Sequence, residues 1–242
     1  MILYKYIRAE HVANVILNGI SKLTRLRKSN DPCEFCPAQE TVDWSIRTDG
    51  KEPIVLCVTP NVYNPVMWER YGIQKKGEEI VKAGGAAVIY DFPIRGRERY
   101  PFPLSANVFL EYFFTNNGIM LLKCIYGSQP IPCPQSEQEV LAFKHRNDAL
   151  KEACFRSLCL MSQKESQWED ENEFRVYRDD SEYHKNNCLL TRDYAPYMTG
   201  IILGEQFSYV SDETIRTWRT QSFRPDFKIF KMESGMHISN FE

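Results

Sequence analysis

The sequence predicts a single α+β domain spanning residues 1–242, with mixed, mostly antiparallel sheets and flanking helices. Its length of 242 residues and mass of 28.3 kDa suit one large domain. Short apolar runs typical of strands alternate with helical patterns, but the connections between them are irregular, which favours α+β over a regular doubly wound sheet. No repeat, low-complexity tract or shift in composition marks a domain boundary.

Each element follows from a local pattern. Strands are predicted from short apolar or alternating runs at residues 2–7, 20–26, 54–59, 86–90, 119–126, 174–177, 200–204 and 227–232. Helices are predicted at residues 9–17, 66–71, 78–82, 136–161 and 212–219. Asn18-Gly19 is typical of a glycine C-cap, and Pro65 suits the first turn of the second helix. The segment 92–103, punctuated by prolines and carrying Arg95, Arg97 and Arg99, is predicted to be a loop.

The charge balance and composition exclude several classes of protein. Lys and Arg number 30 against 32 for Asp and Glu, so the net charge of −2 excludes a protein that holds nucleic acid by overall charge, while a local basic groove stays open. The content of 43% apolar and 26% charged residues excludes wholesale disorder. No apolar run approaches the roughly 20 residues of a membrane span, and no signal peptide is visible. We therefore expect a cytoplasmic protein that does not enter a membrane.

Eight cysteines occur in the chain, and without a secretory signal we interpret them as free thiols. Only Cys33 and Cys36 have the spacing of metal ligands, and the second pair that a structural zinc site usually needs is missing. They form either a zinc or redox pair or a loop with two thiols, and no metal site is predicted. The chain also lacks the glycine-rich phosphate loops, HExxH and GxSxG.

The most informative segment is Lys164-x3-Trp168-x2-Glu171-x-Glu173-x-Arg175. On a strand, Glu171, Glu173 and Arg175 would share one face, because side chains alternate with period two. Carboxylates this close repel one another unless a cation or ligand hydroxyls lie between them. The segment is therefore either a ligand site or a solvated strand face with a Glu–Arg pair.

Two further segments allow a ligand role or a structural role. Asn30-Asp31-Pro32-x-Glu34 has turn propensity, and it forms either a structural turn or a polar loop that faces a ligand. Trp68 and Tyr71 lie three apart on one helix face, where they could stack a flat ring or serve as core anchors.

These motifs, taken in order, resemble a known family. The chain is similar to the bacterial domain of unknown function 2971 over about residues 2–240. The resemblance rests on six short motifs in the right order: Leu3-Tyr4-Lys5-Tyr6, Asn30-Asp31-Pro32-x-Glu34, Val55-Leu56-Cys57-Val58, Met67-Trp68-x2-Tyr71-Gly72 with Lys76-Gly77, the segment from Lys164 to Arg175, and Gly200-Ile201-Ile202-Leu203-Gly204.

The family resembles proteins of abortive-infection systems against phage and, more distantly, the ADP-ribosyltransferase fold, including the branch that modifies DNA. This resemblance implies an intracellular, NAD-dependent effector that acts as a toxin or in phage defence. Glu173 or Glu171 would match the catalytic glutamate, and Trp68 or Tyr71 the aromatic that packs on nicotinamide. Lys5, with Tyr6, would match the early residue that holds NAD, although the transferases usually show His or Arg there. Asn30, Asp31 and Arg175 would complete the NAD site.

The chemistry implied is cleavage of the nicotinamide–ribose bond, which passes through a state with positive charge on the sugar. A fixed carboxylate such as Glu173, held ionised by Arg175 or Lys164, would stabilise that charge, and the acceptor would be a nucleic acid or a protein. Two alternatives stay open: a non-catalytic binding or structural domain, and a magnesium-dependent nuclease using the acidic residues Asp31, Glu34, Glu171 and Glu173 with Lys164.

Overall fold

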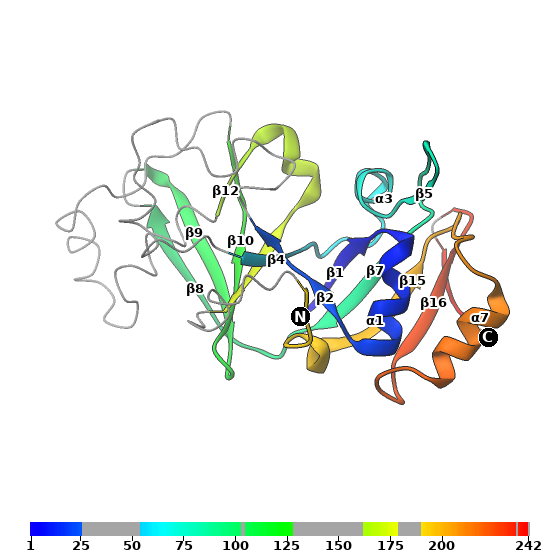
Figure 1. Ribbon diagram of the computed structural model, residues 1–242. Helices are drawn as coiled ribbons and strands as arrows, with labels where there is room; N and C mark the ends of the chain where they lie inside the picture. The colour runs from blue at the N-terminus through cyan, green and yellow to red at the C-terminus, as the bar shows by residue number, and fades with distance from the viewer. Residues whose placement is uncertain (26–53, 103–104, 128–161, 179–189, 236, 242) are drawn as a thin grey trace. The chain divides into compact units, whose positions relative to one another are not determined.

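The computed structural model describes residues 1–25, 54–102, 105–127, 162–178, 190–235 and 237–241. The chain divides into two compact units, which are described separately (Figure 1). Unit 1 comprises Met1–Lys22, Val58–Pro93 and Leu190–Glu242, and unit 2 comprises Leu23–Cys57 and Ile94–Leu189. Segments of the two units alternate along the chain. The amino-acid composition therefore shows no single point at which one unit ends and the other begins.

Unit 1 is built around a five-stranded sheet with the strand order β1-β7-β15-β16-β17. Neighbouring strands pair antiparallel except β15 and β16, which are parallel and are connected through helix α7. The strands of this sheet are β1 (Ile2–Ile7), β7 (Ala86–Asp91), β15 (Met198–Leu203), β16 (Lys228–Glu233) and β17 (His237–Asn240). The other elements of unit 1 are η1 (Ala9–His11), α1 (Val12–Asn18), β2 (Ser21–Lys22), α3 (Pro65–Arg70), β5 (Gln74–Lys76), β6 (Glu79–Val81), β14 (Leu190–Thr191), η4 (Ala195–Tyr197) and α7 (Asp212–Thr220).

The five-stranded sheet carries helices on both faces. Helices α1 and α7 lie against one face (Figure 1), and Tyr90 on that face forms a hydrogen bond with Ser21, just after α1. On the other face, α3 packs through Met67 and Trp68 against Tyr6 and its sheet neighbours. Unit 1 therefore buries apolar side chains on both faces of its sheet. Trp68 of α3 lies in the part of the core on the α3 side.

Close backbone contact explains the glycines at positions 85 and 204. The amide of Gly85 donates to Gly72 O at 2.9 Å, and that of Gly204 donates to Gly85 O at 2.8 Å. A Cβ atom at Gly85 or Gly204 would collide with a backbone carbonyl oxygen, that of Ile7 or Ala83 respectively. These positions need glycine because no side chain fits between the crossing segments.

Unit 2 contains a six-stranded sheet with the strand order β3-β4-β13-β10-β9-β8. The pairs β3–β4, β13–β10, β10–β9 and β9–β8 are antiparallel. The elements assigned here are β3 (Thr24–Arg25), β4 (Ile54–Val58), β8 (Ile94–Phe102), β9 (Ser105–Thr115), β10 (Ile119–Lys123), β11 (Ile125–Gly127), β12 (Gln163–Glu165), η3 (Ser166–Glu171) and β13 (Phe174–Arg178). Strands β11 and β12 form a short parallel pair beside η3.

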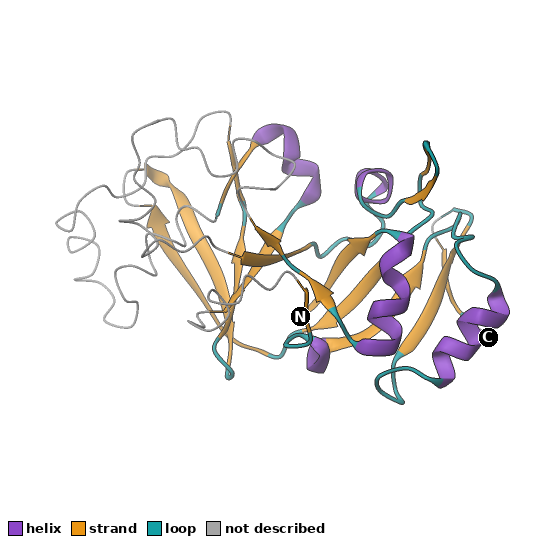
Figure 2. Cartoon of the chain, in the orientation of Figure 1, coloured by secondary structure: helices purple, strands orange, loops and turns teal. Residues whose placement is uncertain are grey.

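The predicted fold class is confirmed as mixed and strand-rich, with mostly antiparallel sheets (Figure 2). The first strand, the Gly19 C-cap with φ of 62° and the proline-started helix α3 are as the sequence predicts. Asn64 caps α3, because its side-chain oxygen accepts from the amides of Val66 at 3.0 Å and Met67 at 3.3 Å. Within the described residues, no helix is both long enough and apolar enough to cross a membrane.

Two local predictions are wrong. Residues 78–82 form part of the β5–β6 hairpin rather than a helix, because Gly77 adopts a φ of 62° and closes a two-residue turn. The predicted loop 92–103 is largely strand β8, which lies last in the strand order of its sheet. An edge strand tolerates Pro101 because an edge residue need not donate to the ladder. The predicted helix 136–161 lies outside the described residues.

Candidate functional site

The acidic motif of unit 2 forms a compact cluster of charged side chains. Lys164 Nζ lies 2.6 Å from Glu171 Oε2 and 2.6 Å from Glu173 Oε2. Arg175 Nε donates to the other oxygen, Glu173 Oε1, at 2.9 Å. We call Lys164, Glu171, Glu173 and Arg175 the ion-pair cluster. It combines two cations with two carboxylates, so it carries no net charge when all four groups are ionised.

The members of the cluster come from three elements. Lys164 lies on β12, Glu171 ends η3 and Arg175 lies on β13. Between the two glutamates, Asn172 adopts the left-handed conformation with φ of 43°, which asparagine tolerates better than most residues. Asn172 ends η3 at this point, and the carboxylates on both sides of it reach the same ammonium group.

Backbone hydrogen bonds fix the position of Glu173. Its amide donates to the Tyr126 hydroxyl at 2.6 Å, and its carbonyl accepts from the amide of Cys124 at 2.9 Å. Tyr126 lies on β11, directly opposite Lys164 in the parallel pair. The sequence reasoning missed Tyr126, because it lies 47 residues before Glu173 and no local pattern links the two.

All four members of the cluster are buried, and Arg175 is fully inaccessible to solvent. Burial by itself raises the pKa of Glu173, but the positive charges of Arg175 and Lys164 and their hydrogen bonds outweigh it and hold that pKa well below its ordinary value. Glu173 is therefore ionised at neutral pH. The half-buried ring of Trp168 adds a cation–π contact, with its centroid 5.3 Å from Lys164 Nζ.

The predicted strand face is corrected in two respects. Glu171 belongs to η3 rather than to a strand, since β13 begins only at Phe174. The alternative of a solvated strand face is wrong, because Glu173 is only 4% exposed. The Glu–Arg pair within that alternative is confirmed at 2.9 Å.

Trp68, the predicted nicotinamide platform, lies in the core of unit 1. Its side chain is 3% exposed, and its indole Nε1 donates to Val62 O at 2.8 Å. The ring of Tyr6 meets it edge-on at a centroid distance of 4.9 Å. A Cβ atom at Gly72 would lie 2.5 Å from the indole, so the Trp-x2-Tyr-Gly spacing reflects packing of the ring against its own chain. Tyr71 packs at the margin of the same cluster.

Lys5 and Trp68 are not brought together. Tyr4 and Tyr6 belong to the Trp68 side of the sheet, so Lys5, which alternates with them on β1, projects to the α1 side. Lys5 is also close enough to His11, the N-cap of α1, to affect its pKa. Burial lowers the pKa of His11 most, and the positive charges of Lys22, Arg8 and Lys5 lower it further. Of the predicted site, the structure unites Glu171, Glu173 and Arg175 in unit 2, and Tyr6, Trp68 and Tyr71 in unit 1.

Asn30 and Asp31 lie outside the described residues, as do Glu34 and the Cys33–Cys36 pair. Within the described part of the chain, no group of three or more His, Cys, Asp or Glu side chains is arranged to hold a metal ion. The carboxylates of Glu171 and Glu173 instead share the ammonium group of Lys164.

The state of Glu173 makes stability depend on pH in a defined direction. Its pKa is lowered on folding, so its contribution is complete above the ordinary carboxyl pKa of 4.5 and is lost as the pH falls toward the folded-state value. We expect the free energy of unfolding, measured by urea denaturation, to decrease as the pH falls below about 4.5. The Glu173→Gln variant should show a shallower decrease than wild type. An equal slope in both proteins would contradict this assignment.

The cluster can hold a negative charge beside two cations, but Glu173 is a weak base because its pKa is lowered far from neutrality.

The comparisons with known proteins assign the chain to no family. No family model matches the chain, and no curated protein and no solved structure is significantly similar to it. Membership of the domain of unknown function 2971 stays a prediction from the motifs.

Proposed function

We propose that the chain is a non-catalytic binding domain in which the ion-pair cluster is a structural element of unit 2. One observation supports this most directly. Both carboxylate oxygens of Glu173 are within 2.9 Å of a cationic nitrogen, and the residue is 4% exposed. An acid in this state is already neutralised by its neighbours, so it has little charge left to offer a substrate.

The energetics of buried charge support the same proposal. A charge taken out of water is costly unless it is paired and hydrogen-bonded, and this cluster supplies pairs for both carboxylates. The contacts join β12 and η3 to the start of β13, three elements that follow one another in the sequence. We infer that the motif Glu171-x-Glu173-x-Arg175 serves to fasten these segments.

ADP-ribosyl transfer by a toxin or phage-defence effector is the second candidate, and one observation favours it. Glu173 stays ionised at neutral pH, which is the charge state needed to stabilise a cationic sugar. For this role Lys164 or Arg175 would have to release a carboxylate oxygen when NAD binds. The two candidates therefore differ in whether the cluster opens.

An NAD assay separates them. We expect wild-type protein incubated with NAD and with protein, DNA or RNA acceptors to release no nicotinamide, and calorimetric titration to detect no saturable NAD binding. The proposal fails if wild type releases nicotinamide and Glu173→Gln, shown to be folded by circular dichroism, does not. The matched control is Glu169→Gln, which changes an exposed glutamate of η3 and should behave as wild type in every assay.

A further inference from the structure

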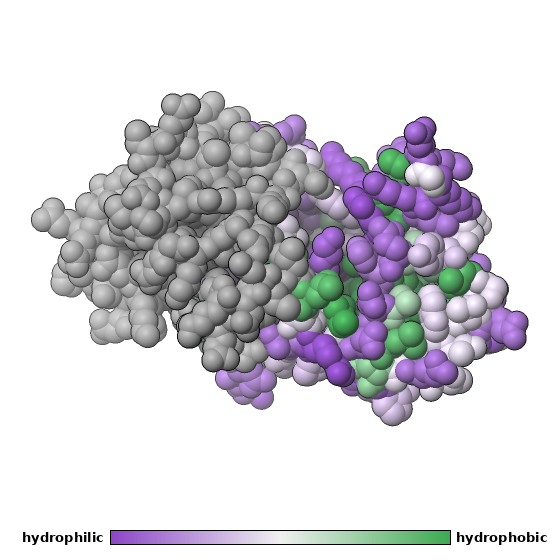
Figure 3. Space-filling view, viewed as in Figure 1, coloured by the Kyte–Doolittle hydropathy of each residue, from purple (hydrophilic) through white to green (hydrophobic). Residues whose placement is uncertain are grey.

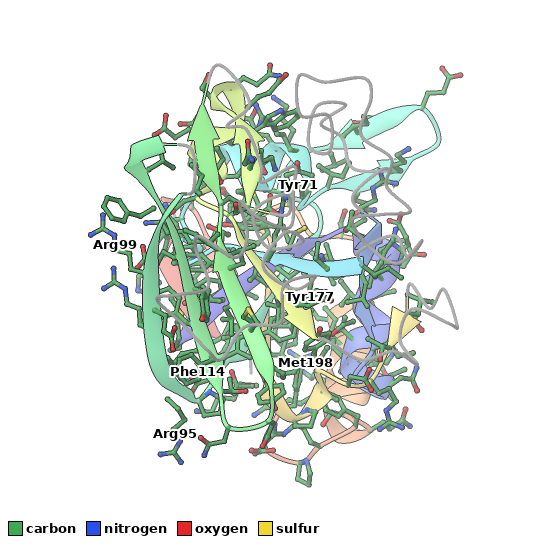
Figure 4. All side chains as sticks on the ribbon, turned by 90° about the vertical axis from the view of Figure 1, so that its left-hand side faces the viewer. Tyr71, Arg95, Arg99, Phe114, Tyr177 and Met198 are labelled. Atoms are coloured by element: carbon green, nitrogen blue, oxygen red, sulfur yellow. The ribbon has the colours of Figure 1, made fainter. Side chains whose placement is uncertain are left out.

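A strip of arginine and phenylalanine side chains lies along strands β8 and β9 of unit 2. Its members, which we call the Arg–Phe strip, are Arg95, Arg97, Arg99, Phe109 and Phe113. The three arginines are exposed and alternate along β8, and Phe109 is 37% exposed on β9. Figure 4 shows Arg95 and Arg99 reaching outward from the margin of the sheet.

Guanidinium groups and rings alternate within the strip. Arg99 Cζ lies 4.0 Å from the centroid of the Phe109 ring, and Arg97 Cζ lies 5.6 Å from that of Phe113. Arg97 also forms an ion pair with Glu111 on the neighbouring strand. Within the described residues, Arg95 and Arg99 have no such carboxylate partner, so the strip carries excess positive charge.

The strip is separate from the ion-pair cluster. Residues directly opposite one another in paired strands point to the same face, and the register runs from Arg97 through Phe113 and Leu121 to Val176. Arg175, next to Val176, therefore points to the other face of the six-stranded sheet. Leu121 and Val176 are fully buried, so the exposed part of the Arg–Phe face is confined to its β8–β9 margin.

We propose that the Arg–Phe strip binds single-stranded nucleic acid. This inference rests on the proposed function, because it names the partner of the binding domain. Proteins that bind single strands without base pairing combine a row of cations for the phosphates with rings on which bases stack, often on the open face of a sheet. Arg97 and Arg99 lie two residues apart on the regular part of β8, so they are about 6.8 Å apart along the strand, a spacing that suits successive phosphates of an extended single strand.

Other anionic partners fit the strip less well. An acidic peptide would use the arginines but offers no flat rings to stack on Phe109, which stays partly exposed beside Arg99. A planar guanidinium over a ring is an arrangement that a base can extend by stacking. On the face of unit 1 drawn in Figure 3, hydrophobic residues lie among hydrophilic ones. In unit 1, Arg216 Cζ lies 5.9 Å from the centroid of the Phe241 ring, but that ring is buried and offers no open face to a base.

The binding should depend on salt. The logarithm of the association constant for a single strand falls by about 0.7 for each neutralised phosphate per unit of log salt concentration. Three arginines predict a slope of about −2, and the double variant Arg95→Ala/Arg99→Ala should reduce its magnitude by about 1 to 1.5. The Phe109→Ala variant should bind about fivefold to a hundredfold more weakly, because stacking on that ring is lost.

The experiment is fluorescence anisotropy with labelled oligo(dT) and oligo(rU) of about 15 nucleotides. Duplex DNA, polyglutamate and anionic vesicles serve as competing probes. The matched control, Lys75→Ala/Lys76→Ala, removes the same charge from the exposed β5–β6 hairpin of unit 1 and should bind as wild type. A melting temperature equal to that of wild type shows that each surface variant is folded.

The proposal is overturned if wild type does not bind oligo(dT) at low salt, or if the strip variants and the hairpin control weaken it equally. Polyglutamate, vesicles or duplex binding more tightly than the single strand would also overturn it. None of these outcomes depends on NAD turnover, which decides the proposed function separately.

Discussion

Replacing Glu173 by glutamine should lower the free energy of unfolding by about 3–5 kcal/mol, the cost of breaking a buried ion pair. The substitution keeps the shape of the side chain but removes the negative charge that lies 2.9 Å from Nε of the fully buried Arg175. It also removes one of the carboxylates that lie 2.6 Å from Lys164 Nζ. Urea denaturation at neutral pH measures the loss.

Two controls make this result specific. Glu169→Gln, on the exposed side of η3, should change the stability by less than about 0.5 kcal/mol. The double variant Glu173→Gln/Arg175→Met removes one charge of each sign, so it should lose less stability than the sum of the two single variants. If Glu173→Gln is as stable as wild type, the cluster is not a structural fastening and the catalytic candidate gains.

Replacing Trp68 by alanine should cost about 3–5 kcal/mol, as for other large aromatic residues removed from a core. The indole fills the space between Tyr6 and Gly72, and its Nε1 is bonded to Val62 O. Without the ring, only Met67 of α3 is left in the core cluster against the five-stranded sheet, and the Val62 carbonyl loses a donor. Thermal unfolding followed by circular dichroism measures the effect.

The comparison variant is Tyr63→Ala, which removes a 49% exposed aromatic residue from the turn before α3 and should have little effect. Trp68→Phe should recover part of the stability, because it restores most of the ring volume but not the hydrogen bond. If Trp68→Ala unfolds like wild type yet loses binding of a nicotinamide or a base, Trp68 would be a ligand platform.

Local patterns predicted much of the fold because the forces that set them act between near neighbours. Gly19 ends α1 and Pro65 begins α3 for reasons contained in the backbone of those residues. The short apolar runs of β1 and β4 also identify strands, since a run of this length is typical of a buried strand. The predictions failed at the β5–β6 hairpin, where Gly77 closes a two-residue turn, and at β8, which is a strand because it pairs with β9.

The chemistry of the candidate residues was decided by contacts across long stretches of chain. Sequence spacing placed Glu173 near Arg175, but it could not show that β11 brings Tyr126 to the Glu173 amide. Alternation along β1 separates Lys5 from Tyr6, but only the packing of α3 shows which face receives Trp68. The charge and solvation of a side chain depend on every group around it, and those neighbours are assembled by the tertiary fold rather than by residues next to it in the chain.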